Sequence, residues 1–413
     1  MSLRNKLIVN DSTKYGRLTI MQQPIVHTYS LGELYTERKE KGDPSLPILT
    51  VSIHAGVSEG ELDEDKLGKK VKRIADKTQY KTAHKGDLVF NMMRAWQGAI
   101  GVVRSDGLVS PAYIVAKPNG KIWPEYMDYC MKTPRMIHAI HRQSYGVTDF
   151  RLRLYWDSFT PITCQLPTLP EQQKIAAILS TQDKVIELKE KLLVQKQQQK
   201  KYLMQQLLTG KKRLPGFDRK WNYVKANEIF KSIVDKSYDG KLEVLSSTQD
   251  KGIVPRSQVD IDIKYNENSL STYKKVCEGD FVISLRSFQG GIEYSNYAGI
   301  VSPAYTVLRA IVKIDAGYYK QFFKSSNYIK RLNVAVYGIR DGKQISYDDF
   351  GQIKIPVPPI EEQREVAKML STADHEIDLL QKSIEAEKQK KKALMQLLLT
   401  GKVRVEDEQK QDG

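Results

Sequence analysis

Two similar stretches decide the fold of this 413-residue chain. Residues 169–211 read LPEQQKIAAILSTQDKVIELKEKLLVQKQQQKKYLMQQLLTGK, and residues 360–402 read IEEQREVAKMLSTADHEIDLLQKSIEAEKQKKKALMQLLLTGK. The stretches begin 191 residues apart, align without a gap and are identical at about half of their positions. Solenoid proteins repeat every 20–50 residues, roughly, which is a far shorter period. The sequence therefore predicts a duplicated half-protein.

Each stretch has the features of one long helix. Proline-rich segments precede both, at Leu166–Pro170 and Ile355–Pro359, and proline is tolerated at a helix start but excluded from its interior. Neither proline nor glycine follows until Gly210 and Gly401, where glycine is typical of a helix end. A helix of about 40 residues is roughly 60 Å long.

Apolar residues recur every seven positions along both helices, which is the spacing of a coiled-coil seam. Lys200 and Lys391 interrupt the seam at matching places. We expect the two helices to pair, and to pair antiparallel, because each leads out of one globular half. Packing of each helix on its own domain is the alternative. The expected packing residues are Leu179, Ile186, Leu193 and Leu207 in the first helix and Leu370, Ile377, Ile384 and Leu398 in the second.

The regions before the helices are also duplicated, more loosely. Short apolar runs bounded by Gly, Asp and Pro favour strands, residues 122–141 and 316–328 favour helices, and Ser110–Tyr113 favours a turn entering a strand. Each half is thus expected to be an α+β domain. The expected segments are 1–165 (first globular domain), 166–211 (central helical repeat), 212–354 (second globular domain), 355–402 (distal helical repeat) and 403–413 (disordered polar tail).

The formal net charge of +16 favours a polyanionic partner, most often nucleic acid. A basic protein without such a partner remains the alternative. No apolar run approaches the roughly 20 residues of a membrane span, and Met1–Asn10 lacks the apolar core of a signal peptide. The cysteines Cys130, Cys164 and Cys277 have no metal-ligand spacing and an odd count. A reduced, cytoplasmic setting is expected.

Comparison of the halves suggests DNA-binding candidates. Positions that agree serve the shared fold or contact phosphate, whereas positions that differ are able to read different bases. Arginine and lysine suit guanine, and asparagine and glutamine suit adenine, in the major groove. An ordinary surface or strand role is the alternative for each residue. The shared candidates are Arg94, Gln97, Arg286 and Gln289, and the variable ones are Asn91, Met93, Trp96, Ser284, Ser287 and Phe288, with Thr148, Arg151 and Arg153 against Arg340, Lys343 and Gln344.

No catalytic pattern is found. The chain lacks a Gly-x-x-x-x-Gly-Lys-Ser/Thr phosphate loop. His138 and His141 lie three residues apart on a predicted helix, but no third ligand with zinc spacing is near. We therefore predict neither a catalytic residue nor a metal site.

These features resemble the specificity subunits of type I restriction-modification systems. The resemblance rests on the Glu-Gln helix starts at residues 169–172 and 360–363, the Leu-Leu-Thr-Gly-Lys helix ends, and the Gly-Asp strands at residues 86–90 and 279–282. It implies that the globular halves are target-recognition domains, each reading one part of a bipartite double-stranded DNA site. It also implies that the helices set the spacer and dock two methylation subunits.

The same resemblance implies a non-catalytic recognition subunit without a cofactor of its own. S-adenosylmethionine is then expected on the methylation subunit, and ATP and Mg on restriction subunits where these exist. A nuclease or methyltransferase with a divergent active site, and a coiled-coil adaptor that binds nucleic acid without sequence preference, are the competing interpretations. Residues up to about Gln23 have no counterpart in the second half.

Overall fold

The computed structural model describes residues 18–19, 27–53, 56–60, 76–146, 148, 151–238, 242–249, 251–259, 267–284, 292–335 and 345–405. The chain forms two compact units, of which unit 1 comprises Met1–Leu188 with Ile384–Gly413 and unit 2 comprises Lys189–Ser383. Each unit therefore contains one globular domain and part of both long helices. No helix in the described ranges is long and apolar enough to cross a membrane.

The globular domain of unit 1 is built on a four-stranded antiparallel sheet. The strand order is β3 (Tyr35–Arg38), β10 (Tyr113–Pro118), β7 (Leu88–Asn91) and β8 (Ile100–Val102). Strand β7 is buried along its whole length, as expected for an apolar run in a sheet covered on both faces. Three two-stranded pairs complete the domain: β2 (His27–Ser30) with β11 (Thr163–Leu166), β4 (Leu49–Ser52) with β5 (Gly56–Glu59), and β6 (Lys81–Ala83) with β9 (Gly107–Val109).

The helices of this domain are short. They are α1 (Leu31–Leu34), α3 (Pro124–Cys130), α4 (Pro134–Gln143) and α5 (Trp156–Phe159), with 3₁₀ turns η1 (Lys77–Gln79) and η2 (Ala95–Gln97). The prediction of one helix over 122–141 is wrong, because the helix is interrupted between α3 and α4. Pro134 cannot continue a helix but suits a first position, and the Thr133 hydroxyl caps the new helix by accepting from the Met136 N–H at 3.3 Å.

Unit 2 repeats this architecture element by element. Its sheet has the order β13 (Phe230–Ile233), β20 (Thr306–Ala310), β17 (Phe281–Ile283) and β18 (Ile292–Tyr294). The predicted helix over 316–328 is likewise two helices, α8 (Ala316–Phe323) and α9 (Ser326–Ala335). The other elements are β12 (Asn222–Lys225) with β21 (Lys354–Val357), β14 (Leu245–Thr248) with β15 (Gly252–Pro255), β16 (Lys274–Val276) with β19 (Gly299–Val301), α7 (Ala226–Ile229), η3 (Arg256–Gln258), η4 (Glu267–Thr272) and α10 (Tyr347–Gln352).

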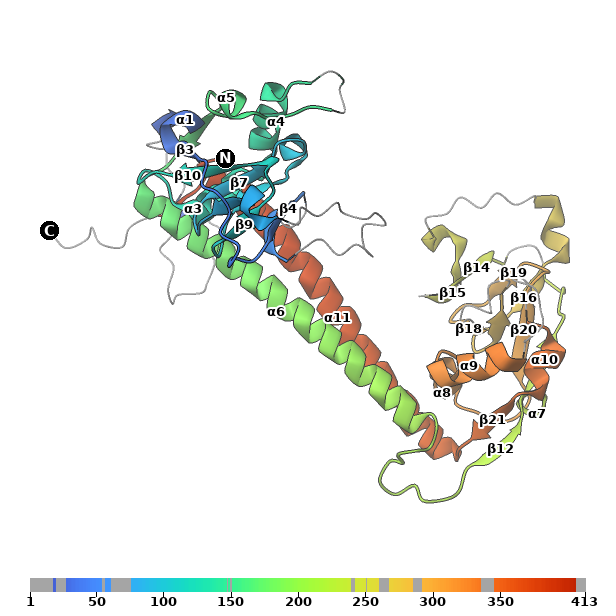
Figure 1. Cartoon of the computed structure of the whole chain (residues 1–413). Coiled ribbons are helices and arrows are strands. Elements are labelled where there is room, and N and C mark those ends of the chain that lie inside the picture. The colour runs from blue at the N-terminus through green and yellow to red at the C-terminus, as the bar shows by residue number, and fades with distance from the viewer. Residues whose placement is uncertain are drawn as a thin grey trace. The chain divides into compact units, whose positions relative to one another are not determined.

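The long helices are α6 (Leu169–Leu207) and α11 (Ile360–Leu399), and they run side by side in both units (Figure 1). In unit 1, Gln182 early in α6 donates to Glu387 late in α11 at 2.7 Å. In unit 2, Lys196 late in α6 contacts Glu376 early in α11, also at 2.7 Å. The predicted antiparallel coiled coil between two α+β halves is therefore confirmed.

The seam of the helix pair is thin, and its ends merge with the domain cores. Leu179 and Leu370 are fully buried, whereas Leu193 and Ile377 in the middle are only half-buried. The core of unit 1 includes Leu179 from the start of α6 and Leu398 from the end of α11. The core of unit 2 includes Leu370 and Leu207 in the equivalent places. The alternative that each helix packs on its own domain thus holds for the helix starts alone.

The repeated Glu-Gln pair at the helix starts joins each domain to the helices. The Gln172 side chain accepts from the Trp123 N–H at 2.9 Å, and Gln363 accepts from the Asp315 N–H at the same distance. Each glutamine also donates to a proline carbonyl just before its helix, at 3.0 Å in unit 1 and 2.8 Å in unit 2. These residues are buried, so the motif shared by the two repeats serves the fold.

The two ends of the chain meet in unit 1. Strand β1 (Leu18–Thr19) pairs with β22 (Arg404–Val405), and Arg404 forms an ion pair with Glu171 at the start of α6. The expectation of a disordered tail from residue 403 is therefore wrong for Val403–Val405, because this ion pair and the burial of Val405 hold them. Residues 406–413 and most of the first 23 residues lie outside the described ranges.

Candidate nucleic-acid interface

The turn between β7 and β8 carries the first set of predicted residues, and its own hydrogen bonds shape it. The Asn91 carboxamide oxygen accepts from the Met93 N–H at 3.0 Å. The Trp96 indole N–H donates to the Met93 carbonyl at 3.1 Å. Gly98, at φ 103°, ends the 3₁₀ turn in a left-handed conformation that favours glycine. Asn91 and Trp96 therefore build the turn.

Three side chains of this turn reach solvent. Met93 is 48% exposed, and Arg94 and Gln97 are also exposed. Tyr113 pairs with Asn91 across the sheet. Burial raises the pKa of its hydroxyl, and the nearby Arg94 charge and Asn91 side chain oppose that rise. The exposed trio is therefore the part of the turn that is free to contact a ligand.

The second predicted loop is anchored beside this turn. Tyr145 and Arg153 exchange two backbone hydrogen bonds of 3.1 and 2.9 Å, and the Leu154 N–H donates to the Met92 carbonyl at 2.9 Å. A side chain at Gly146 would place its Cβ 2.3 Å from the Arg151 carbonyl oxygen, so the loop closes only around glycine. The predicted residues Thr148, Arg151 and Arg153 are exposed.

Helix α4 adds residues that the sequence comparison did not place among the DNA-binding candidates. Its exposed face carries His138, His141 and Arg142, and the His141 ring lies 5.5 Å from that of Trp96. Next to it, Tyr145 is 59% exposed and its ring is 5.1 Å from that of Tyr155. The three-residue spacing of the histidines was the one sequence feature that could have identified this face of α4, and the same spacing is also compatible with metal binding. Among the described residues, no group of three or more His, Cys, Asp or Glu is placed to hold a metal.

In unit 2 the equivalent edge is described only in part. Ser284 follows β17 and is buried at 8% exposure, so it is placed inside the domain rather than on a binding surface. Helix α9 occupies the position of α4 and exposes Lys330, Arg331 and Asn333. The remaining predicted residues, Arg286, Ser287, Phe288, Gln289, Arg340, Lys343 and Gln344, lie outside the described residues.

The Gly-Asp motif shared by the halves places a buried carboxylate in an ion pair with a partly exposed arginine. Asp87 receives Arg38 Nε at 2.7 Å and Nη2 at 3.2 Å. Asp280 receives Arg309 Nε at 2.8 Å and Nη2 at 2.7 Å. Both carboxylates are 2% exposed, so each needs a cationic partner. The arginines come from different strands, β3 in unit 1 and β20 in unit 2.

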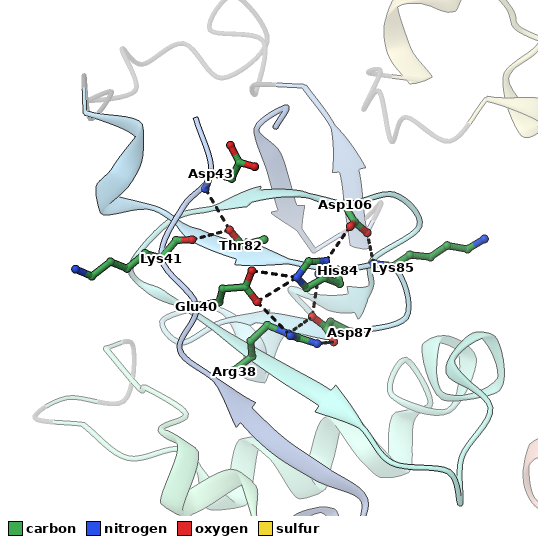
Figure 2. A network of polar contacts seen from close by, with 9 residues as sticks. All are labelled: Arg38, Glu40, Lys41, Asp43, Thr82, His84, Lys85, Asp87 and Asp106. Atoms are coloured by element: carbon green, nitrogen blue, oxygen red, sulfur yellow. Dashed lines mark hydrogen bonds and ion pairs between the residues drawn. The ribbon is translucent and has the colours of Figure 1, made fainter. Parts of the chain in front are cut away.

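His84 extends the unit 1 ion pair into a network at the β6–β7 turn, as Figure 2 shows. Its Nδ1 lies 2.8 Å from Asp106 Oδ2, and its Nε2 lies 3.1 and 3.2 Å from the oxygens of Glu40. These carboxylates, Asp106 first, raise the pKa of His84 against a smaller opposing effect of burial. The network joins the β6–β7 turn to the end of β3, on which Arg38 lies.

The helix pair of unit 2 has a groove of about 390 Å³. Apolar side chains of Leu203, Leu214 and Met369 line it, and Lys196 and Lys368 flank them with other polar residues. Met369 is 40% exposed, so part of the apolar lining is open to solvent.

Comparison with known proteins matches this architecture to one family. Residues 31–196 and 218–388 match the family model of the type I restriction modification DNA specificity domain. The two matched segments correspond to the two globular domains, each with the helix that follows it. The chain belongs to the family of type I restriction-modification DNA specificity subunits, and its globular halves are two target-recognition domains.

Two relatives and two solved structures are similar to most of the chain. The putative type I restriction enzyme MjaX specificity subunit of Methanocaldococcus jannaschii is 25% identical over 406 residues, covering 90% of each chain. The MjaVIII specificity subunit of the same organism is 27% identical over 330 residues, covering 73% of this chain and 75% of that subunit. The S subunit from M. genitalium shares the fold with a TM-score of 0.55 at 13% identity, covering 93% of this chain and 99% of that one. A structure described in terms of complex assembly and conformational transition of the type I R-M system has a TM-score of 0.54 at 20% identity, covering 92% and 98%.

Proposed function

We propose that this chain provides the sequence recognition of a type I restriction-modification complex and that each domain reads one half of a bipartite DNA site. The observation that carries the proposal is the repetition of one architecture with different exposed residues. The edge with His138, His141 and Arg142 on α4 has Lys330, Asn333 and Val334 at the equivalent places of α9. Equivalent surfaces with different chemistry suit two different base sequences.

Within the first domain we assign the residues different roles. Arg94 and Gln97 contact phosphate, because they are exposed and shared with the sequence of the other half. Met93 and the loop residues Arg151 and Arg153 read bases. Asn91 and Trp96, which the sequence places among the base readers, position this surface instead, since their polar atoms are used within the turn.

The helix pair acts as a ruler between the half-sites. Two readers on one face of B-DNA need half-sites about one helical turn, or about 34 Å, apart. Helix α6 has 39 residues and a length of roughly 60 Å, which is sufficient to set such a separation. The proposed spacer is therefore a property of helix length and pairing.

The catalytic steps belong to partner subunits in this proposal. Two methylation subunits that carry S-adenosylmethionine dock on the helix pair, and restriction subunits with ATP and Mg join where they exist. The groove with exposed Met369 supports a docking role for the helices, because an apolar surface of this kind gains stability when a partner covers it. The competing enzyme interpretation predicts turnover by the purified chain alone.

The function is tested by mapping methylated bases, by single-molecule sequencing, in cells that express the chain with its methylation subunit. A split motif with an undefined centre, absent when this chain is omitted, is expected. An unchanged pattern after omission, with the methylation subunit active, would favour the adaptor or the divergent enzyme.

The ruler is tested by inserting one heptad after Leu188 in α6 and one after Ser383 in α11. Seven residues add about 10 Å to a helix, which is the rise of about three base pairs. The spacer is expected to lengthen while both half-sites keep their sequence. Seven residues appended to the C-terminus serve as the control, and altered half-site sequences in the heptad variant would contradict the ruler.

A further inference from the structure

The lysines that interrupt the apolar seam form ion pairs between the long helices. In unit 2, Lys200 of α6 forms an ion pair with Asp374 of α11. In unit 1, Lys391 of α11 contacts Asp183 of α6 at 2.5 Å. The two pairs are equivalent, because Lys200 corresponds to Lys391 and Asp183 to Asp374 in the repeated stretches. The interruption is thus a paired polar contact in both units.

One carboxylate oxygen of each aspartate contacts the lysine of the other long helix, and the second oxygen accepts a hydrogen bond from the globular domain. In unit 2, Oδ1 of Asp374 contacts Lys200 while Oδ2 accepts from the Gln321 carboxamide at 2.7 Å. Gln321 lies on α8 of the globular domain and is 6% exposed. We name these three residues the Asp374 cluster.

The equivalent Asp183 cluster of unit 1 consists of Asp183, Lys391 and Tyr129. Oδ1 of Asp183 contacts Lys391, and Oδ2 accepts from the Tyr129 hydroxyl at 2.7 Å. The Lys391 ammonium also lies 5.4 Å from the centre of the Tyr129 ring. Tyr129 on α3 corresponds to Gln321 on α8, so chemically different residues donate the same hydrogen bond in the two units.

The apolar residues alone cannot define how α6 aligns with α11. Leucine and isoleucine recur every seven residues in both helices, so a shift by one heptad would again place apolar residues against apolar residues. The middle of the seam is only half-buried, which limits its contribution further. A polar residue at a seam position specifies register because its partner exists at one alignment only.

We propose that the Asp374 and Asp183 clusters are the register-determining contacts of the helix pair and transmit that register to the globular domains. The proposal rests on the ruler function, since the clusters would then define the spacing at which the half-sites are read. Partly exposed ion pairs contribute little to stability, and the carboxylates of both clusters are partly exposed. Their main effect is therefore on alignment and domain position.

Lys200→Met separates alignment from stability, because methionine extends the apolar seam while it removes the ion pair. We expect an unchanged or higher unfolding midpoint, together with a distance distribution between α6 and α11 that is about twofold broader. Spin labels at the exposed positions Gln198 and His375, in a Cys277→Ser background of the full chain, measure that distribution by pulsed electron resonance.

The exchanged pair Lys200→Asp with Asp374→Lys is expected to restore a narrow distribution, whereas Lys200→Asp alone broadens it. A wild-type distribution in Lys200→Met overturns the proposal whatever the DNA result. In the complex with the methylation subunits, Lys200→Met is expected to methylate sites with altered spacers and unchanged half-sites. A broadened distribution with an unchanged spacer would instead overturn the ruler and the link between the clusters and spacing.

Discussion

Arg213 forms a bidentate ion pair with Glu362, with Nε 2.6 Å from Oε1 and Nη2 2.7 Å from Oε2. Glu362 is 1% exposed and also accepts from the Trp221 indole N–H at 2.9 Å. The contact ties the chain just after α6 to the start of α11 within unit 2. Arg404 and Glu171 make the equivalent contact in unit 1.

Replacing Arg213 by alanine leaves a buried carboxylate with the indole as its remaining donor. Removal of one partner of a buried ion pair lowers the free energy of unfolding by about 3–5 kcal/mol. We expect a decrease of about 3 kcal/mol, because the Arg213 side chain is partly exposed. Urea unfolding measures the change. Lys212→Ala, at an exposed neighbour, is the control and should stay within about 0.5 kcal/mol. Equal effects of the two variants would show that the ion pair is unimportant.

The stability of unit 1 should depend on pH through His84. Both ring nitrogens face carboxylate oxygens, so the imidazolium form is the one that donates to Asp106 and Glu40 together. The pKa of His84 in the folded state is raised, which means that folding favours the protonated ring. The stabilisation is fully present below the unfolded pKa of about 6.5 and is lost as pH rises through the folded pKa.

The matching measurement compares the wild-type chain with His84→Gln. The difference in urea midpoint should be larger at about pH 5.5 than at about pH 9. Titration of the His84 ring by NMR should give a pKa above about 6.5, and Asp106→Asn should lower it. A pKa at or below the ordinary value, or a midpoint difference independent of pH, would contradict this account.

Gly146→Ala tests the role of the loop beside the β7–β8 turn. The added Cβ would lie 2.3 Å from the Arg151 carbonyl oxygen, so the loop has to move. We expect target methylation by the assembled complex to fall about tenfold, equivalent to about 1.4 kcal/mol, with little change in the unfolding midpoint. Gly120→Ala is the matched control, since its Cβ meets nothing within 4 Å. Wild-type methylation by Gly146→Ala would exclude the loop from recognition.

Arg94 and Met93 should differ in how their loss affects DNA binding. Arg94→Ala is expected to weaken binding to all sequences and to reduce the slope of log affinity against log salt by about one, as for a phosphate contact. Met93→Ala should instead change base preference in one half-site and leave the salt slope unchanged. Affinities of the assembled complex for target and mismatched duplexes, over a range of salt, distinguish the two. Selective loss at one base position in Arg94→Ala would assign Arg94 to base reading.

The architecture could be predicted because the sequence contains two similar repeats. The heptad spacing and the proline and glycine boundaries predict the helices, and Leu179 and Leu370 are buried where the seam requires. The ion pairs of Lys200 and Lys391 could not be predicted, because their partners Asp374 and Asp183 lie far away in the sequence. The break at Pro134 was missed because the apolar pattern continues across it.

The location of the interface stays a prediction, and the structure adds to it the local contacts of the predicted residues. Sequence contrast between the halves suggests the turn with Met93 and Arg94, and the structure joins Leu154 to this turn through the Leu154 to Met92 hydrogen bond. Sequence comparison does not reveal that the Asn91 side chain accepts a hydrogen bond from the Met93 N–H. Such local bonds depend on backbone conformation, which a comparison of residue types does not contain.

The arginines that neutralise Asp87 and Asp280 limit how the two domains can be recombined. Arg38 on β3 corresponds to Ile233 on β13, and Arg309 on β20 corresponds to Lys117 on β10. Moving β3 alone into the second domain would give Asp280 two arginines, and moving β13 alone into the first would leave Asp87 without its Arg38 partner. The smallest piece that can be exchanged without disturbing this buried charge is the strand pair, so a chimaeric reader should be divided between strand pairs and not within them.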